Sequence, residues 1–231
     1  MIAAKNEADM LPDAIASVQA ISDDIVVIDD VSTDETPEIA KRSGARVIKR
    51  KLDGFASQKN FGIKKARHPW VLVLDADERV SQELADSIKH LLPRHNTAAY
   101  EIAFRNHVGD QWLKHGGLYP DYHPRLINKE RAKYGQREIH EQLEVHGDTE
   151  RISGDIIHFT YKNYAEYINK VKKYSSLEAK VQSQKPSLLS VMKEFPYRYI
   201  RLRGWKDGVP GLVSAALLTY YRWRLYGGQA K

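Results

Sequence analysis

The sequence predicts an α/β protein with a doubly wound, mostly parallel sheet of the Rossmann-like kind, followed by a helical C-terminal region. Three observations support this prediction. Apolar strands alternate with helix-period segments over the first hundred residues, two of these strands end in acidic residues, and the charge changes sign along the chain. The 231 residues are 42% hydrophobic and include no cysteine. This composition suits one sizeable core and excludes disulfide scaffolds, cysteine-ligated metals and cysteine nucleophiles.

The first segments alternate between strand and helix. Residues 2–4 predict a very short strand, and residues 11–18 predict a helix with one apolar face. The run Ile25–Ile28 predicts a buried parallel strand. It ends in Asp29 and Asp30, so this strand delivers two carboxylates to the C-terminal edge of the sheet.

The pattern then repeats with clear boundaries. Thr36–Ser43 predicts a helix, which Gly44 ends at the C′ position. Val47–Ile48 predicts a third short strand, and Ser57–Ala66 predicts another helix. Such alternation is typical of a sheet that binds its ligands outside the C-terminal ends of the strands.

A second acidic group follows a longer apolar run. Trp70–Leu74 predicts a single buried strand, and Asp75-Ala76-Asp77-Glu78 follows it directly. Ser81 predicts the N-cap of a helix that runs to Leu92, with Glu78 favouring the N-terminal end of that helix.

The composition changes from Tyr100 onward, where aromatic residues, histidines and glycines become frequent. Tyr100–Phe104 alternates like a strand, His115–Asp121 predicts an ordered loop, and Tyr164–Val181 predicts a lysine-rich helix. The apolar stretch Val209–Tyr221 is shorter than the roughly 20 residues of a membrane-spanning helix, so we expect a buried or interfacial helix there.

The overall net charge of +6 conceals two oppositely charged parts. Residues 151–231 carry 15 Lys and Arg against 5 Asp and Glu, a net charge of +10, whereas the preceding residues are acidic. We therefore predict a catalytic domain over residues 1–160 and a basic, aromatic, helical region over residues 161–231, packed on the first and facing a membrane.

The basic region interleaves cations with aromatic and apolar side chains. The cations are Lys193, Arg198, Arg201, Arg203, Lys206, Arg222 and Arg224. This pattern favours attachment to an anionic membrane surface. A helix that closes the domain is the main alternative, and nucleic-acid binding is disfavoured by the acidic body. No positively charged leader follows Met1, so we expect a cytoplasmic protein, peripheral on the inner face of the cytoplasmic membrane.

The two acidic strand ends predict a shared site for a nucleotide and a divalent metal. Hard carboxylate oxygens suit Mg²⁺ or Mn²⁺, which bridges to substrate phosphates. The alternative is a pair of solvated turns, since Asp, Ser and Thr favour turns and helix caps in any case.

Four motifs in order carry a family resemblance, and further motifs extend it over essentially the whole chain. The first four are Ala4-Lys5-Asn6-Glu7, the block from Val27 to Thr36, Gln58-Lys59-Asn60-Phe61-Gly62 and Leu74-Asp75-Ala76-Asp77-Glu78; downstream come His115–Asp121, Pro124–Ile127, Glu138–Glu141 and Arg203–Leu212. Together these resemble family two glycosyltransferases of the GT-A fold. Within this family they are most similar to the branch that contains the bacterial lipopolysaccharide core β-1,4-glucosyltransferases.

The resemblance implies a role for each nucleotide-site residue. Asp30 would contact the base, Lys59 and Asn60 would lie near the base and diphosphate, Asp75 would hold the ribose, and Asp77 would coordinate Mg²⁺ or Mn²⁺. Asn6 and Glu7 belong to the same nucleotide-binding set. The implied donor is a nucleotide sugar, with UDP as the expected nucleotide.

An inverting transfer also needs a base that takes the proton of the acceptor hydroxyl. Glu141 is the first candidate and Asp121 the second; an exposed edge-strand carboxylate is the alternative interpretation of Glu141. His115, His140 and Arg125 are candidates for contacts with acceptor or phosphate. We expect most of the other histidines downstream of the strands, which are His107, His123, His146 and His158, to be loop or surface residues.

The predicted function is transfer of a hexose, with glucose as the expected sugar, from a nucleotide sugar to a lipid-linked saccharide in cell-envelope glycan or lipopolysaccharide core synthesis. The alternatives are a sugar-phosphate nucleotidyltransferase, a phosphoacceptor signalling domain, and a catalytically silent sugar- or lipid-binding protein. Sugar-phosphate nucleotidyltransferases carry a glycine-rich phosphate loop after the first strand. This chain lacks such a loop, because no glycine precedes Gly44.

Overall fold

The computed structural model describes residues 1–91, 95–135, 143–181 and 185–227. Within it the chain forms two compact units. Unit 1 comprises Met1–Phe104 and Tyr122–His158, and unit 2 comprises Arg105–Asp121 and Phe159–Lys231. Residues 105–121 thus cluster with the C-terminal helices.

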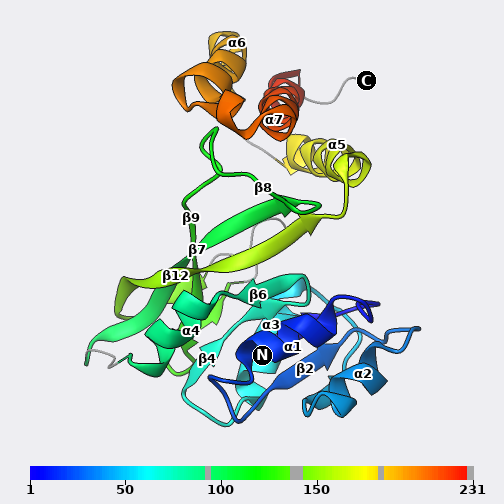
Figure 1. Cartoon of the computed structure of the whole chain (residues 1–231), viewed down its shortest axis with the longest axis vertical. Helices are drawn as coiled ribbons and strands as arrows, with labels where there is room; N and C mark the ends of the chain where they lie inside the picture. The colour runs from blue at the N-terminus through cyan, green and yellow to red at the C-terminus, as the bar shows by residue number, and fades with distance from the viewer. Residues whose placement is uncertain (92–94, 136–142, 182–184, 228–231) are drawn as a thin grey trace. The chain divides into compact units, whose positions relative to one another are not determined.

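Unit 1 contains the expected parallel sheet (Figure 1). Its strands are β1 (Ile2–Ala4), β2 (Val26–Asp29), β3 (Arg46–Lys49) and β5 (Leu74–Asp75), in the order β3-β2-β1-β5. All three pairings are parallel, with Ile2 opposite both Val27 and Leu74. The predicted α/β fold class is confirmed.

The helices between these strands follow the sequence signals. They are α1 (Leu11–Val18), α2 (Thr36–Arg42), α3 (Phe55–Lys65) and α4 (Gln82–Lys89). In α1 the buried residues recur at helical spacing, so one face packs into the core. Gly44 follows α2 with a φ of +85°, as its C′ position requires. Ser81 caps α4 by accepting a hydrogen bond from the backbone N–H of Leu84 at 3.2 Å.

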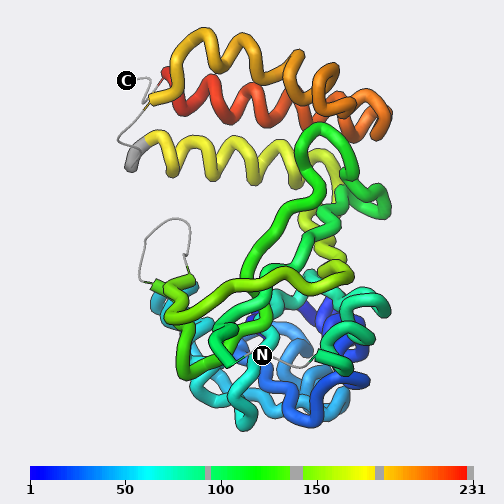
Figure 2. The backbone as a smooth tube through the Cα atoms, turned by 90° about the vertical axis from the view of Figure 1, so that its left-hand side faces the viewer, coloured from blue at the N-terminus to red at the C-terminus, as the bar shows by residue number. Residues whose placement is uncertain are grey.

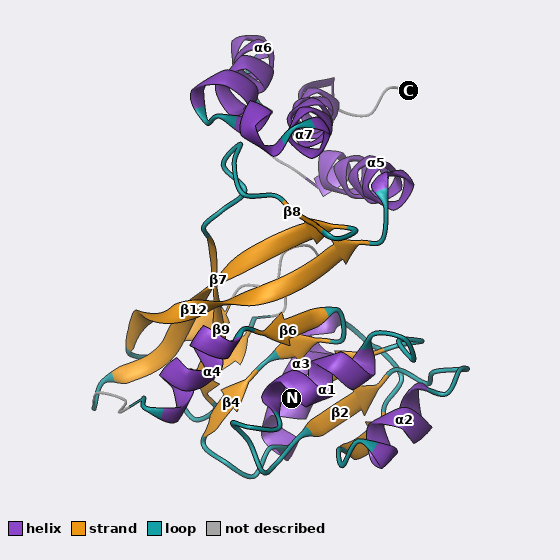
Figure 3. Ribbon diagram, in the orientation of Figure 1, coloured by secondary structure: helices purple, strands orange, loops and turns teal. Residues whose placement is uncertain are grey.

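A second, mixed sheet carries strands that run from unit 1 into unit 2 (Figure 3). Its order is β4 (Trp70–Leu72), β9 (Asp121–Asn128), β7 (Thr97–Val108), β12 (Asp148–Tyr161) and β6 (Glu78–Val80); β8 (Gln111–Trp112) pairs with β7, and β10 (Ala132–Tyr134) pairs with β11 (Leu143–Val145). The pairs β4–β9 and β6–β12 are antiparallel.

The expected single strand Trp70–Leu74 is divided between the two sheets. β4 pairs with β9 in the mixed sheet, whereas β5 pairs with β1 in the parallel sheet. Val73 lies between them and donates its N–H to the carbonyl of Arg125 at 2.8 Å. The prediction of one strand was wrong because both halves are apolar, and hydrophobic pattern alone does not show a change of partner.

Unit 2 is mainly helical. It contains α5 (Tyr164–Val181), α6 (Leu188–Pro196), the one-turn helices η1 (Tyr197–Arg201) and η2 (Gly204–Asp207), and α7 (Val209–Gly227). The helices α5, α6 and α7 lie side by side, with α7 contacting both others (Figure 2). Among the described helices, none is both long and apolar enough to cross a membrane.

Candidate active site

The carboxyl edge of the parallel sheet brings the two acidic strand ends to either side of β1. Asp29 ends β2 and Asp75 ends β5, and both strands pair with β1. Asp29 is fully buried, and its carboxylate accepts the backbone N–H of Ser32. Asp30, the next residue, therefore carries the carboxylate nearer to the sheet edge, in agreement with the ligand site expected there.

Asp30 is held as a carboxylate by its neighbours. Lys5 donates to Oδ2 at 2.7 Å, and the N–H of Leu52 donates to Oδ1 at 2.7 Å. These two hydrogen bonds lower the pKa of Asp30. The residue is thus a fixed anion that can accept hydrogen bonds at neutral pH.

Asn6 and Glu7 are tied to the turn that follows β2. The side-chain oxygen of Asn6 accepts a hydrogen bond from the backbone N–H of Thr33 at 2.8 Å. The backbone N–H of Asn6 donates to the hydroxyl of Ser32 at 2.9 Å. The N–H of Glu7 donates to the hydroxyl of Thr36 at 2.8 Å. Asn6 adopts a positive φ of 54°, which asparagine tolerates better than most residues. The two motifs therefore form one connected rim beside Asp30.

The helix α3 contributes Lys59 and Asn60 in different ways. The Lys59 ammonium lies 3.8 Å from Oδ2 of Asp75. The Asn60 amide donates to the carbonyl of Tyr134 at 2.7 Å and accepts its N–H at 2.8 Å. Lys59 therefore joins the acidic edge, whereas the side-chain amide of Asn60 connects α3 to β10.

Arg125 lies among the carboxylates of the loop after β5. Its Nη2 donates to Oε1 of Glu78 at 2.8 Å and is 3.6 Å from Oδ2 of Asp75. The guanidinium also stands over the ring of Phe104, 5.0 Å from its centroid. Arg125 was considered from the sequence for acceptor or phosphate contacts; the structure groups it with Asp75 and Glu78.

Glu78 is the most deeply buried acid of this group, whereas the sequence indicated only a charge that favours the start of a helix. It lies in strand β6 rather than near a helix end, and it is 0% exposed. Its second oxygen accepts the N–H of Asp75 at 2.9 Å. Burial raises the pKa of Glu78 to about 7; the charge of Asp75 acts in the same direction and Arg125 acts against it.

His158 completes the cluster, and its expected surface position was wrong. It lies in β12 directly opposite Glu78 in the antiparallel pair β6–β12. Its Nε2 is 3.5 Å from Oδ2 of Asp77. Burial alone lowers the pKa of an imidazole, but the contact with Asp77 and the charge of Glu78 outweigh it, so the pKa of His158 is raised. The apolar run around His158 was the available sequence signal.

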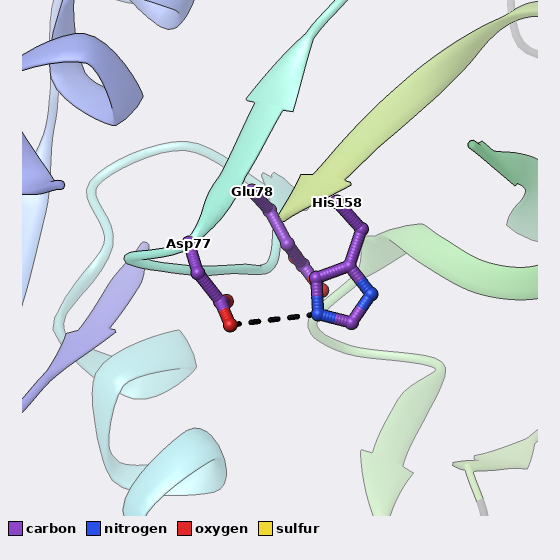
Figure 4. A group of neighbouring side chains, drawn as sticks. All are labelled: Asp77, Glu78 and His158. Atoms are coloured by element: carbon purple, nitrogen blue, oxygen red, sulfur yellow. Dashed lines mark ion pairs between the residues drawn. The ribbon is translucent and has the colours of Figure 1, made fainter. Parts of the chain in front are cut away.

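Asp77, Glu78 and His158 form a group that fits a metal ion (Figure 4). One potential ligand atom from each lies within 4.8 Å of the others. Two carboxylates and an imidazole are suitable donors for Mn²⁺, with Mg²⁺ favouring the oxygens alone. Both oxygens of Glu78 accept hydrogen bonds, from the backbone of Asp75 and from Arg125.

The remaining candidates belong to unit 2 or lie outside the described residues. The N–H and Nδ1 of His115 contact the carboxylate of Asp207, which ties the His-Gly-Gly loop to η2. Asp121 accepts a hydrogen bond from the Asn106 amide at 3.4 Å. His140 and Glu141 lie outside the described residues, so their roles stay predictions.

Comparison with known proteins identifies the family. Residues 1–145 match the model of glycosyl transferase family 2. The chain belongs to this family. An uncharacterized glycosyltransferase of Rickettsia prowazekii is 31% identical over 96% of this chain and 82% of its own length. The lipopolysaccharide core biosynthesis glycosyltransferase LpsC of Rhizobium meliloti, also similar, is 28% identical over 94% of this chain and 85% of its own.

Two similar solved structures each match less than half of this chain. Glucosyl-3-phosphoglycerate synthase from Mycobacterium tuberculosis, in complex with Mn²⁺ and UDP-glucose, shows 21% identity and a TM-score of 0.38 over 45% of this chain and 42% of its own. Mannosyl-3-phosphoglycerate synthase from Rubrobacter xylanophilus shows 24% identity and a TM-score of 0.40 over 46% of this chain and 39% of its own.

Membership of glycosyl transferase family 2 confirms the resemblance found in the motifs. The protein is a glycosyltransferase. The nucleotidyltransferase and phosphoacceptor alternatives are thereby set aside. The acidic edge of the parallel sheet, with Asp75 and Asp77 at its centre, is the candidate active site.

Proposed function

We propose that this chain transfers a hexose, with UDP-glucose as the first donor to test, to a lipid-linked saccharide of the cell envelope or lipopolysaccharide core, with inversion at the anomeric carbon. Family membership supports the transfer reaction. The similarity to LpsC along most of both chains supports the choice of acceptor class. The grouping of Asp77, Glu78 and His158 beside Asp75 is the observation that carries the proposal.

The donor nucleotide is proposed to bind along the rim from Asp30 to Asp75. The carboxylate of Asp30 is fixed by Lys5 and suits the imide N–H of uracil. The carboxylate of Asp75 accepts hydrogen bonds from the ribose hydroxyls, and the ammonium of Lys59 beside it offers a cation to the diphosphate. Asn6, Glu7 and Asn60 form the frame of this site through their hydrogen bonds with backbone or neighbouring side chains.

Asp77 and His158 are proposed to hold Mn²⁺ or Mg²⁺, and Glu78 completes the group of three potential ligands. Such an ion supplies charge neutralisation for the departing diphosphate. Arg125 keeps the buried Glu78 in place by pairing with it at 2.8 Å. The protein thus presents an acidic edge whose side chains hold one another in place.

The base that takes the acceptor proton is proposed to be Glu141 or, second, Asp121. Both are carboxylates, and a carboxylate can accept a proton from a sugar hydroxyl as the bond to the donor forms. Asp121 stands beside Asn106, whose amide restrains its carboxylate. His115, His140 and Arg125 are retained as candidates for acceptor or phosphate contacts.

Unit 2 is proposed to bind the anionic inner face of the cytoplasmic membrane. Among the described residues, twelve of the fourteen exposed large hydrophobic side chains lie in unit 2: Tyr174, Leu177, Leu188, Leu189, Met192, Tyr197, Ile200, Trp205, Val209, Leu212, Trp223 and Tyr226. The exposed cations Lys193, Arg201, Arg203 and Lys206 lie among them in the sequence. This combination matches an interfacial surface that inserts apolar groups and pairs cations with lipid phosphates.

The catalytic proposal is tested by replacing Asp77 with Ala. With UDP-glucose and Mn²⁺, we expect metal-dependent release of UDP to fall at least about a hundredfold, since the loss of one ligand weakens charge neutralisation of the leaving group. Calorimetric binding of Mn²⁺ and UDP should weaken in parallel. The control is Asp86→Ala, which removes an exposed carboxylate of α4. An Asp77→Ala protein that keeps its metal dependence would overturn the metal role.

A further inference from the structure

Unit 2 contains a cavity that the catalytic proposal does not use. Its volume is about 310 Å³, at the lower end of the roughly 300–1,000 Å³ of small-molecule sites. One wall is a single face of α5, formed by Tyr167, Lys170, Val171 and Tyr174. These residues follow helical spacing, so their side chains lie on the same side of the helix.

Four tyrosines line the cavity together with the aliphatic side chains of Leu113, Leu118, Val171 and Leu218. Tyr161 and Tyr167 are stacked, with centroids 4.1 Å apart and planes 21° apart. Tyr221 of α7 and Tyr174 of α5 also line the cavity. Tyr174 is 51% exposed, so the cavity reaches the surface beside this ring. The tyrosines supply flat apolar faces together with hydroxyl groups at their rims.

A chain of polar groups lines the same cavity. The hydroxyl of Thr160 donates to the Asn106 oxygen at 3.2 Å, and the Asn106 amide donates to Asp121 at 3.4 Å. The Lys170 ammonium donates to the carbonyl of Thr160 at 2.9 Å and stands 5.3 Å from the ring centroid of Tyr161. The cavity therefore combines aromatic faces with a carboxylate, an amide, a hydroxyl and an ammonium group.

We infer that this tyrosine-lined cavity binds a sugar ring of the acceptor saccharide. The inference rests on the proposed function. A pyranose has an apolar face of C–H groups, which matches the tyrosine rings, and a rim of hydroxyls that both donate and accept hydrogen bonds. Asp121 accepts from such hydroxyls, and the amide of Asn106 and the ammonium of Lys170 can donate to them.

Two other ligand classes fit this cavity less well. An acyl chain would match the rings and the aliphatic side chains, but it would place methylene groups against the charged groups of Asp121 and Lys170, and burying charges in an apolar contact is costly. A phosphate group would be repelled by Asp121. A neutral saccharide satisfies both the apolar and the polar walls, and the position of Asp121 would place a carboxylate against one of its hydroxyls.

The test is direct binding of a saccharide without any donor. The probe is dephosphorylated core oligosaccharide from bacterial lipopolysaccharide, and its binding is measured by ligand-observed NMR titration; decanoate is the acyl-chain probe. We expect the oligosaccharide to bind, and Tyr174→Ala to weaken binding by on the order of tenfold, because one aromatic face is lost. Tyr174→Phe keeps the ring and should bind within about threefold of the wild type.

A control comes from Phe55, an aromatic residue of unit 1 that lies outside the cavity and is 65% exposed, against 51% for Tyr174. Phe55→Ala should bind the oligosaccharide like the wild type. The inference is overturned if the wild type does not bind it, if Tyr174→Ala binds it equally well, or if decanoate alone binds. A wild type that binds the oligosaccharide but no nucleotide sugar would contradict the proposed function instead, so the two failures can be distinguished.

Discussion

At the scale of single residues, Glu78 is the acid around which the candidate site is organised. It is fully buried, and its two oxygens accept hydrogen bonds from Arg125 and from the backbone of Asp75. His158 faces it across the strand pair β6–β12. A buried carboxyl that shares its surroundings with Asp75 resists ionisation, which is why its pKa is raised to about 7.

This raised pKa predicts a pH dependence of folding. The unfolded chain releases the Glu78 proton near pH 4.5, whereas the folded state keeps it to about pH 7. Between these values the folded state binds more protons, so this group makes stability fall as pH rises. Relative to wild type, Glu78→Gln should therefore gain up to about 1.4 kcal/mol per pH unit between pH 5 and 7. Urea unfolding with a metal chelator present measures the difference.

The neighbouring imidazole provides the control for this measurement. His158 also titrates, and it interacts with both Asp77 and Glu78. Introducing Glu78→Gln into a His158→Gln background, and comparing the double variant with the single His158→Gln variant, removes the imidazole from both proteins. If the stability curves of these two proteins stay parallel from pH 5 to 7, Glu78 does not retain its proton in the folded state.

Sequence reasoning located the acidic edge but not the whole cluster. Asp75 and Asp77 follow an apolar strand within a few residues, so a local pattern reveals them. Glu78 and His158 meet only through the register of two strands that are 80 residues apart in the chain, and no local periodicity encodes that register. The amide of Asn60 pairs with Tyr134, which lies 74 residues away in the chain. A local pattern cannot predict this contact either.

At the scale of elements, helix ends were predictable and sheet partners were not. Ser81 and Gly44 mark a helix start and a helix end through their own conformational chemistry. The run Trp70–Leu74 instead serves two sheets, with Val73 as the junction. Its residues are apolar throughout because both sheets bury them. The composition therefore does not show that the strand leaves one sheet and joins the other.

The contact between β12 and α4 leads to a prediction at Gly154. This glycine has a φ of +93°, and a Cβ added there would lie 2.2 Å from the backbone nitrogen of Leu84. Gly154→Ala should therefore cost both backbone strain and a steric clash, about 2–5 kcal/mol of unfolding free energy in total. Gly44→Ala is the matched control, since its φ is +85° with open space around it.

Chemical unfolding of the two variants separates strain from packing. Gly44→Ala should lose only the strain of the left-handed conformation, about 1–2 kcal/mol. An equal loss in both variants would show that β12 moves away from α4 without cost. A larger loss at Gly154 would support close packing at the strand that carries His158.

At the scale of the whole molecule, the net charge of +6 divides between parts with different tasks. Part of the basic C-terminal region holds the helices together: Arg198 and Arg222 both pair with the buried Glu194, and Arg224 donates to the hydroxyl of Ser176. These contacts all lie within unit 2, so they hold its helices to one another. Charge counting from the sequence could not separate such structural cations from exposed ones, because the partner Glu194 is itself identified only by the fold.

The exposed cations and apolar side chains of unit 2 predict binding to anionic vesicles. Met192 and Ile200 are 67% and 66% exposed, and inserting each into the lipid boundary should contribute about 1.5–3 kcal/mol. In sedimentation with vesicles containing phosphatidylserine, Met192→Asp combined with Ile200→Asp should therefore weaken binding by at least about a hundredfold. Phe55→Asp, at a 65% exposed residue of unit 1, should leave it unchanged. Because lipid phosphates attract Lys193 and Arg201, added salt should weaken wild-type binding; equal binding by the double variant would show that these apolar side chains do not insert.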